Sequence, residues 1–425
     1  MAPSPTVYDM TEEDPSGRHR VVIAGGGVAG LEALIAMRDL APGRVATTLL
    51  APTPEYLVRA LSVQDPFARP TPRHYSLQQI AADHDAEFVQ DGLAAADTAH
   101  NRVETSAGTH ISFDSLLVAI GARPEAAFER VNTFRGLQDA EAMHGLIQDV
   151  EGGYSKRIAF VVPPGVTWPL PLYELALMTA ERAYSLGMDV ELTIVTPEEE
   201  PLGLFGRSAS ESVASSLADA GITVIAGAQV REVTGGEVVE RSGDVLVRAQ
   251  RVLALPRLEG PRVAGLEADA HGFLPVDEQG RVTGTTDVFA AGDGTTFPIK
   301  QGGIAAQQAD TVARAIARRA GAEIEAVPFR PVLRAKLLTG SQAKYLREAS
   351  LGDDEPDEAS STVADHTLWW PPSKVAAPYL SPYLEQLDER GAASPRSSGS
   401  GSRDANAAFL HVEGDPADGI ELLGQ

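Results

Sequence analysis

Residues 20–40 read RVVIAGGGVAGLEALIAMRDL, and this stretch decides the fold. The apolar run at residues 21–23 predicts a buried strand, while Leu31 and Leu34 recur at the spacing of one helix face. A glycine-rich turn joins the two segments. The apolar segment VATTLLAP (residues 45–52) predicts the next parallel strand. Together these segments predict a βαβ unit.

The turn carries the pattern G-x-G-x-x-G directly between the strand and the helix. In such a turn Gly25 permits the tight bend, Gly27 lets the backbone approach a pyrophosphate, and Gly30 lets helix and strand pack closely. Val28 and Ala29 begin the helix, whose free N–H groups and positive dipole end favour phosphate. The sequence therefore predicts a dinucleotide phosphate site at these five residues.

One expected partner of that site is missing. An acidic residue for the ribose hydroxyls is usual about 20 residues further on, at the end of the second strand. Here the position holds Ala51, with Glu55 a few residues later in the following loop. The contact to the adenosine ribose is left unassigned.

A second unit of the same kind follows, with KRIAFVVPP (residues 156–164) as strand and a helix from about residue 171 to 186. The two units form a weak internal repeat and predict an α/β fold. The second connecting loop, however, contains prolines, which lack N–H donors, and Trp168, which would fill the space of a pyrophosphate. Binding of NAD(P)H at this loop is therefore not favoured, although it stays an alternative.

Two residues of this second unit are candidates for chemistry. Trp168 is either an aromatic lid over the cleft or a core-filling residue. Glu174 is either a proton acceptor or substrate contact, or an acid that complements the helix dipole.

The stretch VFAAGDGTTFPIKQGGIAAQQ (residues 288–308) is the third informative segment. Asp293 follows an apolar strand and can accept hydrogen bonds from a polyol chain. Gln301 and Gly302 lie at the start of a helix, whose dipole favours negative charge on a facing group. Lys300 adds a full positive charge there, unless it is a solvated surface lysine.

Composition narrows the classes of function. Lys plus Arg number 35 and Asp plus Glu 59, so the formal net charge is −24, and such a surface repels nucleic acid. No apolar run approaches the roughly twenty residues of a membrane span, and the first residues lack the pattern of a secretory signal. We expect a cytoplasmic protein, with peripheral contact at the inner face of the membrane as an alternative.

The sequence contains no cysteine. This absence excludes disulfide frameworks, thiolate metal sites and mechanisms that use a cysteine nucleophile or a redox-active cysteine pair. No metal site is expected.

The glycine turn, LLVAIGARP (residues 116–124) and the 288–308 segment, in this order and spacing, resemble the two-dinucleotide-domain flavoproteins, which are glutathione-reductase-like FAD/NAD(P)-linked oxidoreductases. Within this group, Lys300 and the segment PFRPVLRAKLLTG (residues 328–340) resemble the corresponding parts of one branch. That branch contains sulfide:quinone reductase, the flavoprotein of flavocytochrome c sulfide dehydrogenase and type II NADH dehydrogenase. The resemblance covers about residues 19–386.

The resemblance implies FAD as the cofactor and an oxidoreductase activity. It implies a flavin site made of the pyrophosphate loop, the end of the 116–124 strand and the AGD segment. The residues concerned are Gly25, Gly27, Val28, Ala29, Gly30, Ala119, Gly121, Gly292, Asp293, Lys300, Gln301 and Gly302. Lys300, Glu174 and Trp168 are the candidates for the catalytic side of the flavin.

Because sulfide oxidation in this branch uses cysteines beside the flavin, the absence of cysteine excludes that mechanism. We expect an FAD-dependent enzyme that passes electrons between flavin and a small-molecule or quinone-type substrate. One alternative is an NAD(P)H dehydrogenase of the type II kind. Another is a non-catalytic or electron-relay flavoprotein that docks a partner through its C-terminal tail.

The C-terminal part contains Trp369 and Trp370, which indicate a packing or homodimer patch, or a surface that meets quinone or membrane. These residues are expected to line the substrate side together with Trp168 and Glu174. The domain division predicted from the sequence comprises a disordered N-terminus (1–18), an FAD domain (19–125 and 265–326), an inserted degenerate NAD(P)-binding-like domain (126–264), a small α+β C-terminal domain (327–386) and a disordered tail (387–425).

Overall fold

The computed structural model describes residues 9–10, 17–67, 74–136, 139–349 and 360–393. The chain divides into a unit of residues 1–383 and a second unit of residues 384–425. Within the second unit, the described residues belong to helix α7 (Leu380–Ala393). Among the described residues, no helix is long and apolar enough to cross a membrane.

The first sheet has five parallel strands and contains the glycine turn. In spatial order its strands are β21 (Val288–Ala290), β10 (Ser115–Val118), β2 (His19–Ala24), β3 (Val45–Leu50) and β6 (Ala86–Val89). Leu117 of β10 pairs with Ile23 on one side and with Phe289 on the other. Because the strands are parallel and in this register, the loops after β2, β10 and β21 all leave the sheet at one edge.

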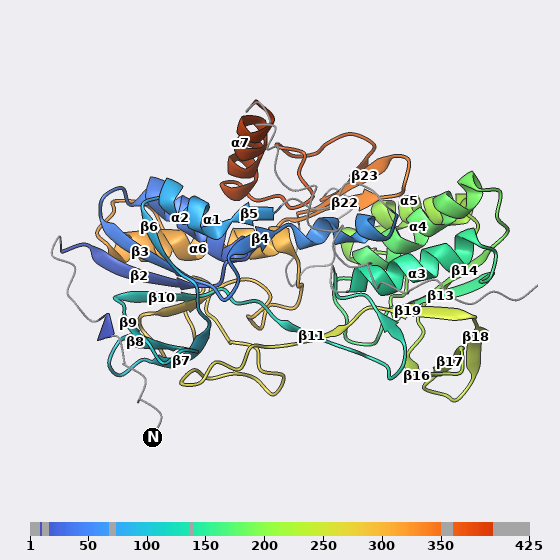
Figure 1. Ribbon diagram of the computed structural model, residues 1–425, viewed down its shortest axis with the longest axis horizontal. Helices are drawn as coiled ribbons and strands as arrows, with labels where there is room; N and C mark the ends of the chain where they lie inside the picture. Colours follow the sequence, from blue (N-terminus) through green and yellow to red (C-terminus); the bar gives the residue numbers. More distant parts are fainter. Residues whose placement is uncertain (1–8, 11–16, 68–73, 137–138, 350–359, 394–425) are drawn as a thin grey trace, which may run out of the picture. The chain divides into compact units, whose positions relative to one another are not determined.

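Helices and a smaller sheet cover the first sheet. Helix α1 (Val28–Leu40) packs against α6 (Gly302–Arg319), and α2 (Leu77–Asp83) packs against β6 (Figure 1). A four-stranded sheet lies beside them, made of β1 (Asp9–Met10), β9 (His110–Ser112), β8 (Arg102–Thr105) and β7 (Leu93–Asp97). The core between them is apolar, with Val22, Phe113 and Leu116 at most 1% exposed.

The second sheet repeats this architecture. It contains β12 (Asn132–Thr133), β19 (Arg251–Ala254), β13 (Arg157–Val161), β14 (Glu191–Val195) and β15 (Ile222–Ile225), all parallel. Its helices are α3 (Ala140–Glu151), α4 (Leu170–Ser185) and α5 (Arg207–Asp219). An antiparallel ribbon of β16 (Val230–Thr234), β17 (Glu237–Glu240) and β18 (Val245–Arg248) extends from it (Figure 1).

Shorter elements connect the part of the chain around the first sheet (the first half) with the part around the second sheet (the second half). An antiparallel pair, β11 (Arg123–Glu125) and β20 (Arg257–Glu259), runs between the two sheets, and the 3₁₀ segment η1 (Arg59–Phe67) packs against α3 and α4. The remaining short elements are the hairpin of β4 (Glu55–Leu57) and β5 (His74–Ser76) and the turn η3 (Gly203–Phe205).

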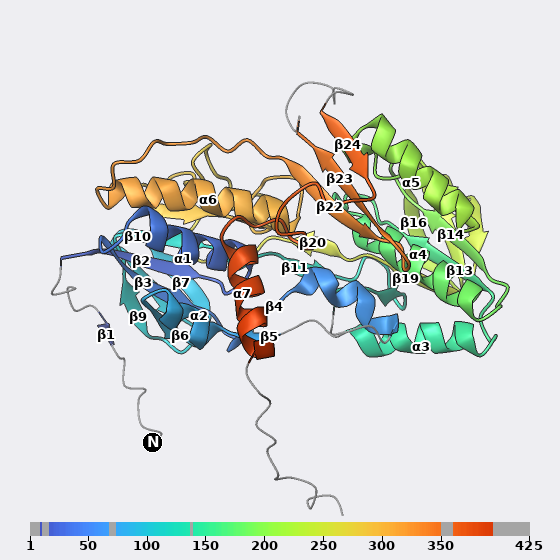
Figure 2. The same cartoon turned by 90° about the horizontal axis from the view of Figure 1, so that it is seen from above.

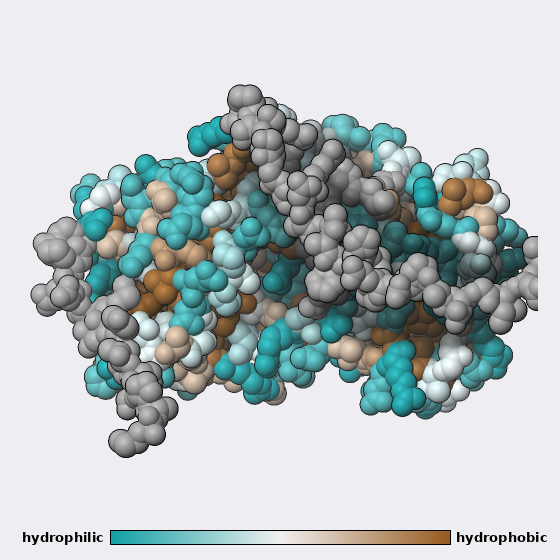
Figure 3. Space-filling view, viewed as in Figure 1, coloured by the Kyte–Doolittle hydropathy of each residue, from teal (hydrophilic) through white to brown (hydrophobic). Residues whose placement is uncertain are grey.

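A third, antiparallel sheet consists of β22 (Leu333–Leu338), β23 (Ala343–Glu348) and β24 (Ser361–Ala364). It lies beside α4 and α5 (Figure 2), and Leu333, Leu337 and Leu346 join the core that α4 fills. On the face drawn in Figure 3, hydrophilic residues predominate and apolar ones are scattered outside the grey atoms.

The prediction of an α/β fold with two Rossmann-like units and a small third part is confirmed. The predicted domain boundaries stay a prediction. The structure differs from the expected disorder at both ends, since residues 9–10 pair with β9 and α7 continues to Ala393. Pairing through backbone groups leaves little pattern in a short polar sequence, so the first of these was not visible. The rest of the two end segments, apart from residues 17–18, lies outside the described residues.

Candidate functional site

The glycine turn lies at the edge where β2, β10 and β21 end, and its three motif glycines meet different surroundings. A Cβ on Gly25, whose φ is +124°, would lie 2.2 Å from the carbonyl oxygen of Ala119. A Cβ on Gly30 would lie 1.8 Å from the carbonyl oxygen of Gly25. A Cβ on Gly27 would meet nothing within 4 Å. Gly25 and Gly30 therefore serve the packing of the turn, whereas open space lies in front of Gly27.

That open space faces the start of α1. Gly27 is the N-cap residue, and it places no side chain on the free N–H groups of the first turn, where Val28 and Ala29 lie. Helix N-termini without such a cap favour an anionic group. The open space in front of Gly27, next to these free N–H groups, thus fits the diphosphate of a dinucleotide.

The neighbouring loops complete this cradle. The N–H of Ala119 donates to the carbonyl of Ala24 at 2.7 Å, which fixes the end of β10 against β2. Gly121 has φ +73° and open space around its Cβ position. On the other side, the N–H of Gly292 donates to the buried side chain of Gln308 at 2.7 Å. These contacts hold all three loops at the same edge.

The residues expected near the adenosine end are placed differently. Ala51 is 1% exposed, and the carboxylate of Glu55 lies 2.9 Å from the ring nitrogen Nδ1 of His74 within the β4–β5 hairpin. Glu55 is therefore engaged by the hairpin, and the ribose contact stays unassigned.

Lys300 and Asp293 carry opposite charges on one loop. The ammonium of Lys300 donates to the carbonyl of Thr295 and lies 4.0 Å from the ring centroid of Phe273. Burial lowers the pKa of Lys300 to about 8, although the charges of Asp293 and Asp269 oppose this shift. Burial raises the pKa of Asp293, against the effect of Lys300. Lys300 is thus a half-buried cation rather than a solvated surface lysine.

Gln301 and Gly302 begin α6, as the sequence predicts. The side-chain oxygen of Gln301 accepts the N–H of Ile304 at 2.7 Å, and its amide nitrogen donates to the carbonyl of Arg334 at 3.0 Å. Gln301 therefore caps α6 and ties it to β22.

A cavity of about 500 Å³ lies next to this loop. Its wall includes Lys300, Asp293, Gln301 and Gly302 from the first half, and Trp168 from the second. The structure therefore brings Trp168 to the same cavity as Lys300, although the two are far apart in the sequence.

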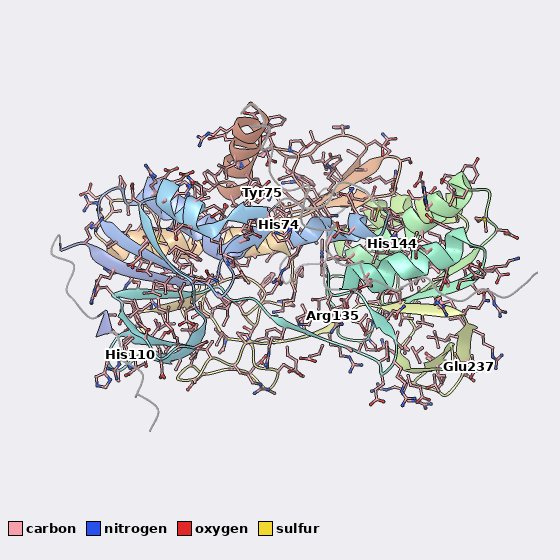
Figure 4. The ribbon with its side chains drawn as sticks, in the orientation of Figure 1. His74, Tyr75, His110, Arg135, His144 and Glu237 are labelled. Carbon is pink, nitrogen blue, oxygen red and sulfur yellow. The ribbon has the colours of Figure 1, made fainter. Side chains whose placement is uncertain are left out.

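The cavity also has residues that the sequence did not single out. They are polar, charged or aromatic and come from η1 and from several loops: Arg59, Ser62, Arg135, Asp269, His271 and Phe273. Arg135, labelled in Figure 4, forms a two-bond ion pair with Asp139. These residues stand outside any motif, and only the folded chain gathers them.

Trp168 has two neighbours. Its ring centroid lies 6.0 Å from that of Phe205 in the second half, while the residue also forms part of the cavity wall. The hydroxyl of Thr167 donates to the carbonyl of Pro298 at 2.5 Å, which joins the proline-rich loop to the loop that carries Lys300. Trp168 thus fills space and forms the cavity wall at once.

Glu174 differs from the expectation. It is 1% exposed, forms an ion pair with Lys374 and accepts the N–H of Leu338 at 2.8 Å. Burial raises its pKa, and Lys374 opposes that shift. It is absent from the cavity wall, because its carboxylate is engaged with Lys374 and the N–H of Leu338. The expectation that Glu174 contacts substrate is therefore corrected. Glu174 instead links α4 to β22 and to Lys374, which lies in the segment between β24 and α7.

The tryptophan pair differs as well. Trp369 packs against Tyr345 of β23 with ring centroids 5.2 Å apart, and its indole N–H donates to the carbonyl of Ser373 at 3.1 Å. Trp370 is 80% exposed. Neither residue belongs to the cavity wall, because both follow the third sheet rather than the edge where the loops meet.

The second connecting loop ends near an acid that the sequence analysis missed. Glu198 follows β14 and accepts hydrogen bonds from Tyr173 at 2.6 Å and from Thr196 at 2.9 Å. A cleft of about 470 Å³ beside it is lined by Glu198, Glu199 and Glu200. An acid in this position is the expected ribose partner of a Rossmann unit, but a cleft with three carboxylates disfavours phosphate.

Comparison with known proteins agrees with this fold. Residues 19–316 match the model of the family described as pyridine nucleotide-disulphide oxidoreductase. The chain belongs to this family.

Curated relatives cover parts of the chain. A sulfide-quinone reductase of Aquifex aeolicus is 24% identical over 266 residues, which is 59% of this chain and 61% of that protein. An NADH dehydrogenase-like protein of Mycobacterium tuberculosis is 29% identical over 64% of this chain and 72% of its own length. Apoptosis-inducing factor 3 of mouse is 27% identical over 49% of this chain, and the match spans 34% of that protein.

Solved structures show the same fold. The sulfide:quinone oxidoreductase of Aquifex aeolicus has a TM-score of 0.74 at 21% identity, covering 88% of this chain and 90% of that one. A ferredoxin reductase of Rhodopseudomonas palustris has a TM-score of 0.61 at 18% identity, covering 80% and 84% of the two chains.

Proposed function

We propose that this protein binds FAD at the glycine turn and passes electrons between the flavin and a small-molecule or quinone-type substrate in the adjoining cavity. The observation that carries the proposal is the cavity itself, whose wall contains both Lys300 and Trp168 together with Asp293 and Gly302. Family membership supports FAD, and the likeness to a sulfide-quinone reductase supports a quinone-type substrate. A cytoplasmic protein in peripheral contact with a membrane would meet such a substrate there.

In this proposal, separate residues bind the parts of FAD and the substrate. FAD supplies the redox chemistry when bound. The turn at Gly27 would hold its diphosphate, and Asp293 would accept hydrogen bonds from its ribityl chain. Lys300 and the start of α6 at Gly302 would favour negative charge at the facing edge of the flavin. Trp168, which lines the same cavity, would limit the size of the substrate.

The lack of cysteine shapes the reaction. Since the sequence contains no cysteine, no thiol can relay electrons between substrate and flavin. The substrate must therefore meet the flavin directly in the cavity. This requirement favours compact donors or acceptors that fit beside Trp168.

An NAD(P)H dehydrogenase is the second candidate, favoured by the mycobacterial relative and by Glu198 at the end of β14. Against it stand Pro163 and Pro164, which lack N–H donors for a diphosphate, and Trp168 in the same loop. The carboxylates beside Glu198 also repel phosphate.

The proposal is tested with the purified flavoprotein reduced anaerobically by light. Short-chain quinones and other small acceptors are then mixed with it, and return of the flavin absorbance is followed in time. We expect at least one acceptor to reoxidise the flavin with saturation kinetics, and Trp168→Ala to change its apparent Kd. Reoxidation no faster than that of free reduced FAD by every acceptor would refute the proposal.

A further inference from the structure

The outer face of the third sheet gathers positive charge. Along β22 the buried Leu333, Ala335 and Leu337 alternate with half-buried residues that point to the opposite face. The register places Arg334 of β22 directly opposite Arg347 of β23, and Lys336 opposite Tyr345. The outer face thus carries a basic cluster made of Arg334, Lys336 and Arg347.

No carboxylate neutralises this cluster within the described part of the chain. The guanidinium groups of Arg334 and Arg347 have no hydrogen bond or ion pair with any described residue, and Lys336 donates only to the carbonyl of Pro372, at 3.4 Å. The nearby acids are engaged elsewhere. Glu348 accepts from Ser360 and lies on the buried face, while Asp365 pairs with Lys344.

This arrangement is costly unless something compensates it. Like charges that face each other across two strands destabilise a sheet. Burial and the positive charge of Arg347 both lower the pKa of Arg334, which nevertheless stays charged at neutral pH. Elsewhere in this strongly acidic chain, Arg20, Arg182 and Arg251 each pair with a carboxylate.

We propose that Arg334, Lys336 and Arg347 form a binding site for a phosphate-type oxyanion. Two guanidinium groups on adjacent strands offer planar donor pairs that match the oxygens of phosphate, and the ammonium of Lys336 adds a third cation on the same face. The bound anion offsets the repulsion between Arg334 and Arg347. Its source is either free phosphate or the headgroup of an anionic phospholipid.

The site is linked to the redox cavity but does not depend on it. The carbonyl of Arg334 accepts the amide of Gln301 at 3.0 Å, and Gln301 caps α6 beside Lys300. The proposed anion site does not use the flavin or the cavity residues. Its anion binding is measured without turnover, so its failure and the failure of the proposed electron transfer can be told apart. Residues 350–359, between β23 and β24, are rich in acid and lie outside the described part.

The test uses the FAD-loaded protein, so that the diphosphate cradle is closed to phosphate. Binding of inorganic phosphate is measured by calorimetry and by the shift in melting temperature, against sodium chloride at matched ionic strength. Co-sedimentation with vesicles of phosphatidylcholine, with and without phosphatidylglycerol, is the second arm. Arg347→Gln is the main variant, Arg347→Lys the conservative one, and Arg231→Gln the control, because Arg231 pairs with Glu232 on a separate ribbon.

We expect phosphate to raise the melting temperature of the wild type and R347Q to weaken binding at least about tenfold. R347K should fall between them and R231Q should match the wild type. Without phosphate, R347Q should melt no lower than the wild type, since one of two repelling charges is gone. Binding only to vesicles with phosphatidylglycerol, lost in R347Q, would assign the headgroup as the source. Absence of binding in both arms, or equal binding by R347Q, would overturn the proposal.

Discussion

At the scale of single residues, the glycines of one turn have separate tasks. Gly25 and Gly30 have no room for a Cβ, because the backbone carbonyl oxygens of Ala119 and Gly25 lie at 2.2 and 1.8 Å from the two Cβ positions. Gly27 faces open space. Substitutions at these positions should therefore separate folding from cofactor binding.

Gly27→Trp should abolish FAD binding while the chain still folds, because the indole would occupy the space of the diphosphate. The measurements are the flavin absorbance of the purified protein and its circular dichroism. Gly30→Ala is the matched comparison and should cost roughly 1–3 kcal/mol of unfolding free energy or more, through a backbone clash. A yellow G27W protein would contradict the assignment of the cradle.

Lys300 is the second residue whose role is measurable. Lys300→Met should retain FAD and lower the reduction potential of the bound flavin by about 30 mV or more, since a cation near the reduced flavin is lost. Lys344→Met, which removes a cation paired with Asp365, is the control.

The same lysine predicts a pH dependence. Because the pKa of Lys300 is about 8, its charge is present below that pH and is lost above it. The potential of the wild type should therefore fall more steeply with pH above about 8, and K300M should lack this change of slope. Identical pH profiles of the two proteins would rule out the role given to Lys300.

At the scale of elements, buried carboxylates link helices α1 and α4 to residues 374–380, where the chain leads into α7. Glu32 of α1 is fully buried, and its two oxygens accept the N–H groups of Tyr379 at 3.0 Å and Leu380 at 2.7 Å, where α7 begins. Burial raises the pKa of Glu32 to about 7, although these two hydrogen bonds oppose the shift. The start of α7 is thus held by an acid that titrates near neutrality.

This shift fixes the sign of a stability change. Glu32 binds a proton more tightly in the folded chain than in the unfolded one, so its contribution is full below about pH 4.5 and is lost as the pH rises to about 7. We expect the unfolding free energy of the wild type to fall over this window by on the order of 3 kcal/mol relative to Glu32→Gln. Denaturant titrations of both proteins at several pH values measure it, and parallel curves would contradict it.

The ion pair of Glu174 and Lys374 links α4 to the same C-terminal segment. Glu174→Leu alone should cost about 3–5 kcal/mol, because it leaves Lys374 buried and uncompensated. The double variant with Lys374→Met should cost only about 1–3 kcal/mol, mainly for the lost bond to the N–H of Leu338. Chemical denaturation of the single and double variants tests this. Additive losses would show that the pair is not coupled.

At the scale of the whole molecule, local motifs were predictable and their surroundings were not. The turn at residues 25–30 and the start of α6 follow from short sequence patterns with fixed backbone consequences. The direction of Glu174 depends on how α4 packs against β22, and that contact joins residues 164 positions apart. Arg135 and His271 reach the cavity from loops without any pattern, so only the folded chain reveals them.

The second Rossmann unit illustrates the same limit. Its prolines and Trp168 predict a loop unsuited to a diphosphate, and the structure places this loop against the one that carries Lys300. Glu198 favours the binding of a nucleotide at this unit. It could not be singled out from the sequence, because a run of three glutamates after a strand resembles a solvated loop.

The measurement that tests the central claim most directly is anaerobic mixing of the purified protein with NADH and with NADPH at near-equimolar ratio. The account predicts a flavin that is released as FAD on denaturation and whose absorbance band persists on the stopped-flow timescale with either nucleotide. Rapid bleaching of that band by either nucleotide, or a protein purified without FAD, would contradict it.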